Sequence, residues 1–271
     1  MRSYLYVPGN RPSMLATALS RGADALIVDL EDAVPPGEKS AARDAVAGWL
    51  RTLPEGSPVY VRINEGKDGL ADASAVAGPA LRGLCVAKAG TVDQLAGITA
   101  ELDRAGAPAT VELVPLLETA QAILSAPALA AAPRVRRLQI GEADLAAELG
   151  VTLGADEREL IYVRSAVVLA SASAGIEPPA AAVTTDFRDL DRLRRTTAAL
   201  KRLGFRGRAC IHPAQIPVVN DVFTPAPAQL AAARDLIERF EAAGGGVCLD
   251  ARGRMVDLAV VREARRTLRD G

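Results

Sequence analysis

Short apolar runs alternate with longer helical segments along the whole chain, and this alternation is the strongest constraint on the fold. Eight runs have the length and composition of buried β-strands. They lie at residues 4–7, 24–30, 58–63, 83–88, 110–116, 136–141, 180–186 and 208–212. Because many of these runs are continuously apolar, they predict strands buried on both faces, as in a parallel sheet that helices cover.

Helical periodicity fills the segments between these runs. Several of the helical segments begin at proline, serine, threonine or aspartate, which favour the first turn of a helix. We expect helices at 12–21, 38–51, 91–104, 119–131, 156–174 and 188–203. Eight such repeats in 271 residues predict the α/β class and a (β/α)8 TIM barrel. A doubly wound open sheet is the structural alternative, because periodicity does not show whether a sheet closes.

The end of the chain departs from the barrel pattern. A helical segment at 226–243 is followed by "AAGGGVCLDARGRMVD", a glycine-bearing hinge, and then by a last helix at 259–269. We therefore expect a catalytic barrel over residues 1–225, and a C-terminal helix, flap and final helix over 226–271. This second part is expected to pack on the barrel or to be swapped to a neighbouring subunit.

Composition excludes several classes of partner. The formal net charge is −1, and Lys and Arg are spread along the chain, so we expect no nucleic-acid partner. No stretch of about 18 apolar residues is present, and Pro8 comes too early for a signal peptide, which predicts a cytoplasmic protein with no membrane partner. Cys85, Cys210 and Cys248 are odd in number and far apart, so we interpret them as buried thiols rather than disulfides or zinc ligands.

Polar and charged side chains gather where the predicted strands end, which is where the active sites of such barrels lie. The residues at these ends are Asp29, Glu31, Asp32, Arg62, Lys88, Glu118, Glu142, Asp144 and His212. The stretch "ALIVDLEDAV" has the highest density of charge, because three carboxylates, Asp29, Glu31 and Asp32, fall within four positions at the end of a predicted buried strand.

Two of these acids predict a metal site. Glu118 and Asp144 follow consecutive strands, which run about 4.8 Å apart, so their carboxylates can reach one ion. A single histidine and no paired cysteines provide poorly for zinc or iron, whereas Mg²⁺ takes one or two protein carboxylates and leaves its other positions to water and substrate. Arg62 offers a planar fork for a carboxylate or for an oxygen that gains negative charge. Together these residues predict a pocket for an anionic oxo acid.

Each of these residues also has a purely structural interpretation. Glu118 and Asp144 could each be an acid in the first turn of a helix, and Arg62 could form a structural salt bridge. Lys88 at a strand end is more often solvated or paired, and His212 is more often a hydrogen-bonded structural imidazole. The functional interpretation therefore depends on the group of residues rather than on any single member.

Seven segments, in order along the chain, resemble a known family. They are "RSYLYVPGNRP", "GADALIVDLEDAVPPGEKSAAR", "VRIN", "LLETAQAI", "GEADLAAELG", "IHPAQIPVVNDVFTP" and "GRMVD". On these motifs the chain resembles the citrate lyase β-subunit (CitE-like) group of the HpcH/HpaI aldolases, which includes malyl-CoA and methylmalyl-CoA lyases. The resemblance implies a TIM barrel, a homotrimer or hexamer, and Mg²⁺. It also implies reversible carbon–carbon cleavage of a 3-hydroxyacyl-CoA into a short acyl-CoA and a 2-oxo acid of the oxaloacetate or glyoxylate type.

The resemblance also implies roles for individual residues. Glu118 of "LLET" and Asp144 of "GEADL" would bind the metal, and Glu118 would also border the substrate. Arg62 of "VRIN" would hold the oxo acid and take part in catalysis. Asp257 of "GRMVD" would act as acid or base on the site of a neighbouring subunit.

The remaining acids are less directly involved. Glu31 and Asp32 of "DLEDAV" would hold metal-bound waters and the pocket floor, a role that needs acceptors close to a cation. Four positions depart from the family pattern: Thr17, Ala87, Glu142 and Arg252. The acid beside Asp144 has moved by one position to Glu142, and Thr17 stands where many relatives have a lysine near the thioester carrier.

Three other functions are consistent with the sequence. The β subunit of a citrate lyase complex acts on a citryl thioester of an acyl carrier protein and requires partner subunits. A pyruvate-type class II aldolase has a histidine directly after the glutamate of the second strand, where this chain has Asp32. A barrel that binds the oxo acid without turning it over is the third.

Overall fold

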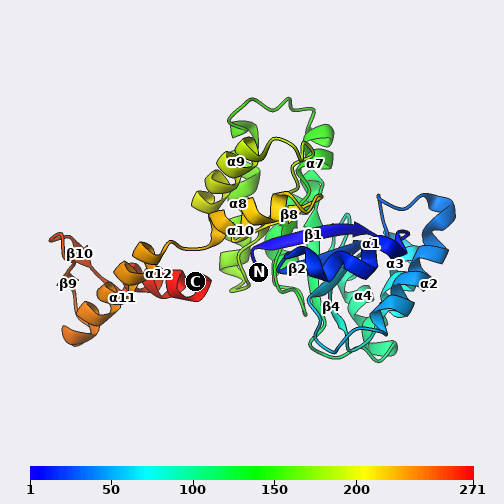
Figure 1. Cartoon of the computed structure of the whole chain (residues 1–271), viewed down its shortest axis with the longest axis horizontal. Helices are drawn as coiled ribbons and strands as arrows, with labels where there is room; N and C mark the ends of the chain where they lie inside the picture. Colours follow the sequence, from blue (N-terminus) through cyan, green and yellow to red (C-terminus); the bar gives the residue numbers. More distant parts are fainter. The chain divides into compact units, whose positions relative to one another are not determined.

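The computed structural model describes residues 1–271, and its main feature is a closed barrel of parallel strands (Figure 1). The strands pair in sequence order, and β8 pairs with β1. They are β1 (Ser3–Pro8), β2 (Ala25–Asp29), β3 (Val59–Ile63), β4 (Leu81–Val86), β5 (Glu112–Leu117), β6 (Gln139–Ile140), β7 (Ala180–Ala181) and β8 (Gly207–Cys210). The predicted TIM barrel is therefore confirmed, and the open-sheet alternative is wrong.

Helices lie between the strands and cover the barrel. They are α1 (Pro12–Ala18), α2 (Lys39–Leu50), α3 (Gly66–Val76), α4 (Val92–Arg104), α5 (Ala120–Leu124), α6 (Ala126–Ala130), α7 (Glu142–Leu149), α8 (Ile161–Ser173), α9 (Leu190–Leu203) and α10 (Gln215–Phe223). Short 3-10 turns at Leu19–Arg21, Pro36–Glu38 and Arg158–Leu160 extend or precede three of them.

Several segments differ from the sequence-based expectation, such as the strand expected over 136–141, which covers only Gln139–Ile140. Two of them have a local cause. The helix expected over 119–131 is split at Ser125, because Pro127 has no N–H to continue the hydrogen-bonding pattern and restricts the residue before it. The strand expected over 180–186 ends at Ala181. Beyond it, the Thr184 carbonyl accepts a hydrogen bond from the Gln215 side chain (3.1 Å) instead of pairing with a neighbouring strand.

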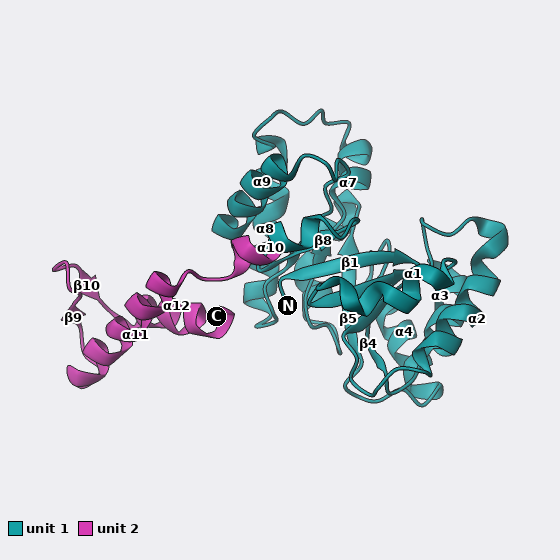
Figure 2. Ribbon diagram, in the orientation of Figure 1, with its two compact units in different colours: residues 1–219 teal, residues 220–271 magenta.

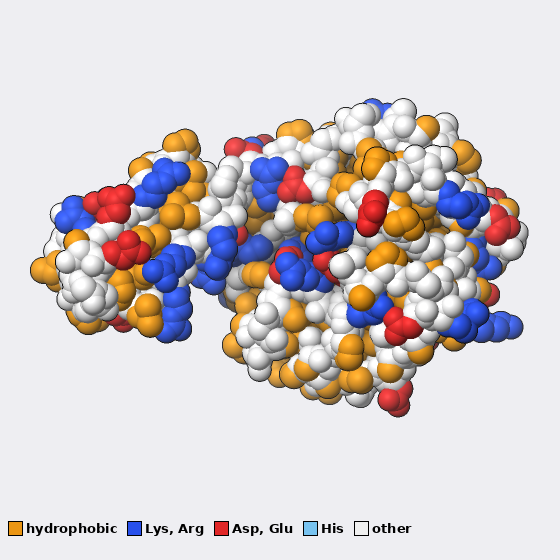
Figure 3. Space-filling view, turned by 90° about the horizontal axis from the view of Figure 1, so that it is seen from below, with side chains coloured by type: hydrophobic (Ala, Val, Ile, Leu, Met, Phe, Trp, Pro, Cys, Tyr) orange, Lys and Arg blue, Asp and Glu red, His pale blue; other side chains and the backbone are white.

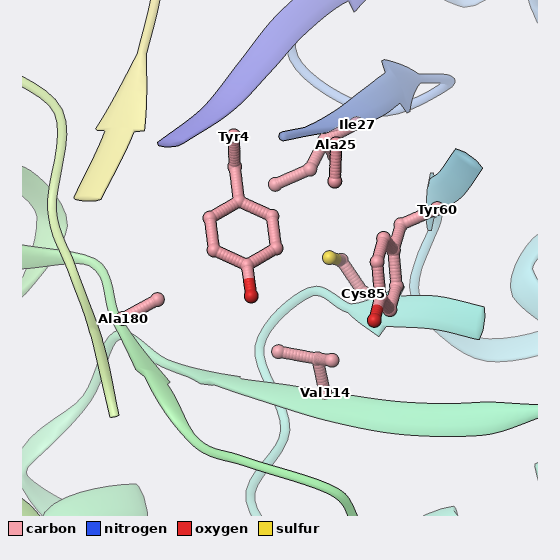
Figure 4. Close-up of a cluster of buried hydrophobic side chains, with 7 residues drawn as sticks. All are labelled: Tyr4, Ala25, Ile27, Tyr60, Cys85, Val114 and Ala180. Carbon is pink, nitrogen blue, oxygen red and sulfur yellow. The ribbon is translucent and has the colours of Figure 1, made fainter. Parts of the chain in front are cut away.

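Side chains from six strands fill the barrel interior (Figure 4). Tyr4 and Tyr60 meet edge to face with ring centroids 5.9 Å apart, and Ile27 and Val114 belong to the same buried cluster. Close packing of this layer needs Gly83 on β4, because a Cβ there would lie 2.6 Å from a β5 carbonyl oxygen and 2.9 Å from the Tyr60 ring. The cluster makes the barrel a packed core that supports the ends of its strands.

The chain divides into two compact units, residues 1–219 and 220–271 (Figure 2). The second unit contains α11 (Pro227–Ala242), the antiparallel pair β9 (Cys248–Leu249) and β10 (Met255–Val256), and α12 (Leu258–Asp270). Phe240, Val256 and Val261 form its small apolar core. Its surface mixes charged and hydrophobic side chains (Figure 3), and Leu249 and Met255 are both exposed.

Two further sequence-based expectations concern the cysteines and the membrane. Cys85 and Cys210 are buried, as expected, whereas Cys248 is only half-buried. All three thiols are free. None of the helices combines the length and apolar character that crossing a membrane requires.

Candidate active site

A cavity of about 500 Å³ opens at the carboxyl ends of the barrel strands. Its walls come from β1 to β3 and β5 to β8 and from the segments that follow them, so residues far apart in the sequence share one space. The polar side chains that line it are Tyr6, Asp29, Asp32, Arg62, Glu118, Gln139, Glu142, Asp144 and Thr185. Tyr6 also packs on the buried core cluster, which connects the floor of the cavity to the interior of the barrel.

Glu118 and Asp144 enter the cavity from neighbouring strands. Glu118 directly follows β5, and β5 pairs with β6 through Leu117 and Ile140. After β6 the chain passes Gly141 and starts α7, which carries Asp144 in its first turn. Glu118 packs so closely on Gly141 that a Cβ at that position would lie 2.5 Å from the Glu118 Cγ. The glycine of "GEADL" is thus required by the glutamate of "LLET".

The Glu118 carboxylate is buried and its environment favours the proton over the charge. Burial raises its pKa to about 7, and the nearby carboxylates of Asp144 and Glu31 add to this effect. The backbone N–H of Lys88, which donates to Glu118 Oε2 at 2.9 Å, and the charge of Arg62 act in the opposite direction. Lys88 has a left-handed backbone conformation (φ 50°), which is strained for a residue with a side chain and is typical of functional sites. A bound cation would remove the proton that burial favours.

Arg62 is held rigidly by Asp29. Its Nε donates to Asp29 Oδ1 at 2.8 Å and its Nη2 to Oδ2 at 2.5 Å, so the pair is bidentate. Asp29 is itself fixed by the backbone N–H groups of Glu31 (2.9 Å) and Ala33 (3.1 Å). The Arg62 guanidinium also lies over the Tyr6 ring, 5.1 Å from its centroid. The first acid of "DLEDAV" therefore orients the arginine of "VRIN", a role that the sequence analysis did not assign.

The other two acids of "DLEDAV" surround the remaining side of the guanidinium. Arg62 Nη1 lies 3.1 Å from Glu31 Oε2 and 3.1 Å from Asp32 Oδ2. Glu31 is buried and also pairs with Lys88 Nζ at 3.2 Å. Burial and a hydrogen bond to Asp32 raise the pKa of Glu31. The pKa of Asp32 is lowered: partial burial acts against this shift, but the hydrogen bond to Glu31 and the charges of Arg62 and Lys88 outweigh it. Of the two neighbouring carboxyls, Glu31 therefore holds a proton more readily than Asp32.

Replacement of Asp29 by asparagine is expected to lower the free energy of unfolding by about 3 kcal/mol, because it leaves a buried guanidinium without its bidentate counter-charge. Urea denaturation followed by circular dichroism measures the change. Asp24→Asn is the matched control, since Asp24 pairs with Arg2 in a more exposed position and should cost about 1 kcal/mol or less. Equal losses in the two variants would contradict the assigned role of Asp29.

The other sequence-predicted residues have partners of their own. His212 is exposed, stacks on Phe187 with ring centroids 4.6 Å apart, and accepts a hydrogen bond at Nδ1 from the Ala214 N–H. Asp257 belongs to the C-terminal unit, where its carboxylate caps α12 by accepting the N–H groups of Ala259 (2.9 Å) and Val260 (3.0 Å). Glu142 lines the cavity, but its carboxylate pairs with Arg164.

The donor set of the cavity suits a hard cation. Glu118 and Asp144 offer carboxylate oxygens, and the structure contains no group of three or more His, Cys, Asp or Glu side chains that could hold a metal. Two carboxylates with adjacent open space match a cation that keeps water and substrate as its other ligands, as Mg²⁺ does. The residues present therefore fit such an ion.

Comparison with known proteins agrees with this fold and shows the family. Residues 2–213 match the HpcH/HpaI aldolase/citrate lyase family model, and the chain belongs to this family. Among its relatives, (3S)-malyl-CoA thioesterase of Cereibacter sphaeroides is 34% identical over 98% of this chain and 93% of that protein. Citrate lyase subunit beta of Leuconostoc mesenteroides is 31% identical over 99% of this chain and 92% of that protein.

Solved structures give the same result. The crystal structure of CitE from Mycobacterium tuberculosis in complex with magnesium, acetoacetate and coenzyme A superposes with a TM-score of 0.80 and 32% identity, covering 99% of this chain and 97% of that one. The citrate lyase beta subunit of M. tuberculosis, complexed with oxaloacetate and magnesium, matches with a TM-score of 0.70 and 32% identity over 83% of this chain and 97% of that one.

Proposed function

We propose that this protein is a Mg²⁺-dependent carbon–carbon lyase that reversibly cleaves a 3-hydroxyacyl-CoA into a short acyl-CoA and a 2-oxo acid. The observation that carries the proposal is the meeting of Glu118, Asp144 and the Asp29-anchored Arg62 in one cavity. The CitE structures with magnesium, coenzyme A and small oxo acids support the same class of ligands.

Charge balance supports the cation. Five acidic side chains line the cavity and only one basic side chain does. Asp29 is paired with Arg62 and Glu142 with Arg164, so the acids still outnumber their basic partners. An anionic 2-oxo acid would be repelled by this lining. Glu118 and Asp144 would hold Mg²⁺, which when bound would supply positive charge for the substrate carboxylate and for the oxygen that becomes an alkoxide. The charge of Arg62 would add to this stabilisation at a fixed position.

The proton transfer is assigned to Asp257. In the direction of synthesis, Asp257 of a neighbouring subunit would take a proton from the α-carbon of the acyl-CoA, and the enolate would attack the carbonyl carbon of the oxo acid. The alkoxide that forms would take a proton from water to give the hydroxyl group of the product. Cleavage is the reverse, in which Asp257 returns the proton. Because Asp257 would act on the site of a neighbouring subunit, the proposed enzyme is a homotrimer or hexamer. We propose that it acts in the cytoplasm on CoA thioesters. Glu31 and Asp32 would bind waters around the cation.

A second candidate function is hydrolysis of the thioester. It is favoured by the 34% identity to relatives named (3S)-malyl-CoA thioesterase, which span nearly the whole chain. Hydrolysis would break the carbon–sulfur bond and release free coenzyme A with an intact hydroxy acid. Lyase chemistry breaks the carbon–carbon bond and leaves the thioester intact, so the two products differ.

Product analysis separates the candidates. The purified protein is incubated with malyl-, methylmalyl-, citramalyl- and hydroxymethylglutaryl-CoA, with Mg²⁺ or with EDTA. A lyase yields an oxo acid or ketone, detected as its phenylhydrazone, and an acyl-CoA, detected by chromatography. Release of free coenzyme A without an oxo acid would show that the protein is a thioesterase and not a lyase. Metal-dependent oxo-acid binding without any product would indicate a binding protein, and activity only on a citryl acyl carrier protein would indicate a citrate lyase subunit.

A further inference from the structure

The displaced acid of "GEADL" lines the cavity and is held by a buried arginine on the next helix. Glu142, the first residue of α7, receives two hydrogen bonds from Arg164 on α8: Nε to Oε1 at 2.6 Å and Nη2 to Oε2 at 2.7 Å. The Arg164 side chain is only 6% exposed. A buried arginine that engages both oxygens of one carboxylate fixes its direction as well as its charge.

The same guanidinium extends the contact to two further elements. Arg164 Nη2 also donates to Glu157 Oε2 at 2.7 Å, and the other oxygen of Glu157 accepts from Arg192 of α9 at 3.2 Å. Glu157 has a left-handed backbone conformation (φ 51°), which a residue with a side chain adopts only where its surroundings enforce it. Arg164 is therefore the central residue of a network that connects α7, α8 and α9.

The start of α7 has no side-chain cap, although Leu145 in the same turn is buried. Its N-cap is Gly141, which has no side chain to accept a hydrogen bond from the first turn. Glu118 packs against one side of Gly141, and the Arg164 fork holds Glu142 on the next residue. Asp144 lies two residues further along the same turn, so the direction of its carboxylate depends on how that turn is held.

We infer that Arg164 is a positioning residue for the cation site: acting through Glu142, it holds the first turn of α7 so that Asp144 faces the cavity. The inference rests on the proposed function only in that Glu118 and Asp144 bind a divalent cation. It gives Glu142 a role, transmitting the position of Arg164 to Asp144, that is not part of the proposed cleavage reaction.

The test measures cation affinity directly, without substrate. Mn²⁺, a spectroscopic substitute for Mg²⁺, is titrated into the full-length protein, and free Mn²⁺ is counted by electron paramagnetic resonance. Arg164→Lys retains a positive charge but not the fork, so we expect the Kd for Mn²⁺ to rise about 10- to 100-fold, as for other groups that orient metal ligands. Glu142→Gln, a milder change, should raise it by a smaller factor in the same direction.

Arg192→Gln is the matched control, because it removes the outermost ion pair of the same network and should leave the Kd within about twofold. Thermal unfolding of each variant shows whether it is folded at the titration temperature. If Arg164→Lys does not fold, Glu142→Gln alone decides. A Kd unchanged in the folded Arg164 and Glu142 variants would overturn the inference and leave the proposed function intact. Absence of Mn²⁺ binding by the unaltered protein would overturn both.

Discussion

Replacing Glu118 with glutamine is expected to abolish divalent-cation binding and to lower kcat/KM by about a thousandfold, which corresponds to about 4 kcal/mol of lost transition-state stabilisation. Glutamine has the size of glutamate, so it still fills the space against Gly141 and can still accept the Lys88 N–H. It lacks the negative charge that a cation needs. Mn²⁺ titration and steady-state rates on the substrate found in the product screen measure the two effects. Full activity of this variant with Mg²⁺ would refute the metal site.

The pH dependence of cation binding gives an independent control on the same residue. Because burial raises the pKa of Glu118 to about 7, a cation must displace a proton at lower pH, and the apparent affinity should fall by about tenfold per pH unit below 7. The cation-free protein should show the opposite preference. A carboxyl whose pKa is higher in the folded than in the unfolded chain stabilises the fold at low pH, and this contribution is lost as pH rises through about 7. In Glu118→Gln the first trend should vanish together with cation binding, and the second should weaken because glutamine does not titrate.

The barrel could be predicted because parallel strands buried on both faces leave a simple trace in the sequence. The run 24–30 contains β2, and all five residues of that strand are buried. The residues at which strands and helices begin and end could be predicted less well. The chain leaves β7 after two residues because a distant side chain, Gln215, takes up the backbone carbonyl of Thr184. Helix α3, with Gly66 and Gly69 within its range, gives too weak a helical pattern to be identified from periodicity.

The composition of the cavity could be inferred from strand ends, since Arg62, Glu118 and Asp144 all line it. Their roles remain proposals. The partners that orient these residues were not visible, because an ion pair such as Glu142 with Arg164 depends on how two helices pack. One signal was available. Side chains alternate along a strand, so Asp29 must point the same way as Ile27, into the barrel.

The same alternation explains how core and site divide the barrel interior. Tyr60 belongs to the buried apolar cluster, and Arg62, two residues later on β3, reaches the cavity above it. Asp29 and Arg62 are direct partners in the register of β2 and β3, so their ion pair follows from strand pairing. The apolar layer below excludes water from one side of this pair, which strengthens its electrostatic interaction with a bound anion or alkoxide.

Replacing Asp257 with asparagine is expected to reduce α-proton exchange of the acyl-CoA by about 100- to 10,000-fold, the usual contribution of a general base. Asparagine caps helices as well as aspartate does, so the hydrogen bonds to Ala259 and Val260 at the start of α12 should persist. Asp257→Ala, in contrast, would also destabilise that helix by about 1 kcal/mol. The asparagine variant therefore removes the base and leaves the cap.

Exchange is measured by deuterium uptake from D₂O into the acyl group with Mg²⁺ and a non-reacting oxo-acid analogue present. The matched control is Asp250→Asn in the same unit, where Asp250 accepts the N–H groups of Arg252 (2.8 Å) and Arg254 (2.9 Å) but has no proposed role in proton transfer. Oxo-acid and Mn²⁺ binding should be unchanged in both variants, because the cavity is built from the N-terminal unit. Normal exchange by Asp257→Asn would reject Asp257 as the base, and loss of exchange in both variants would show that the effect is structural.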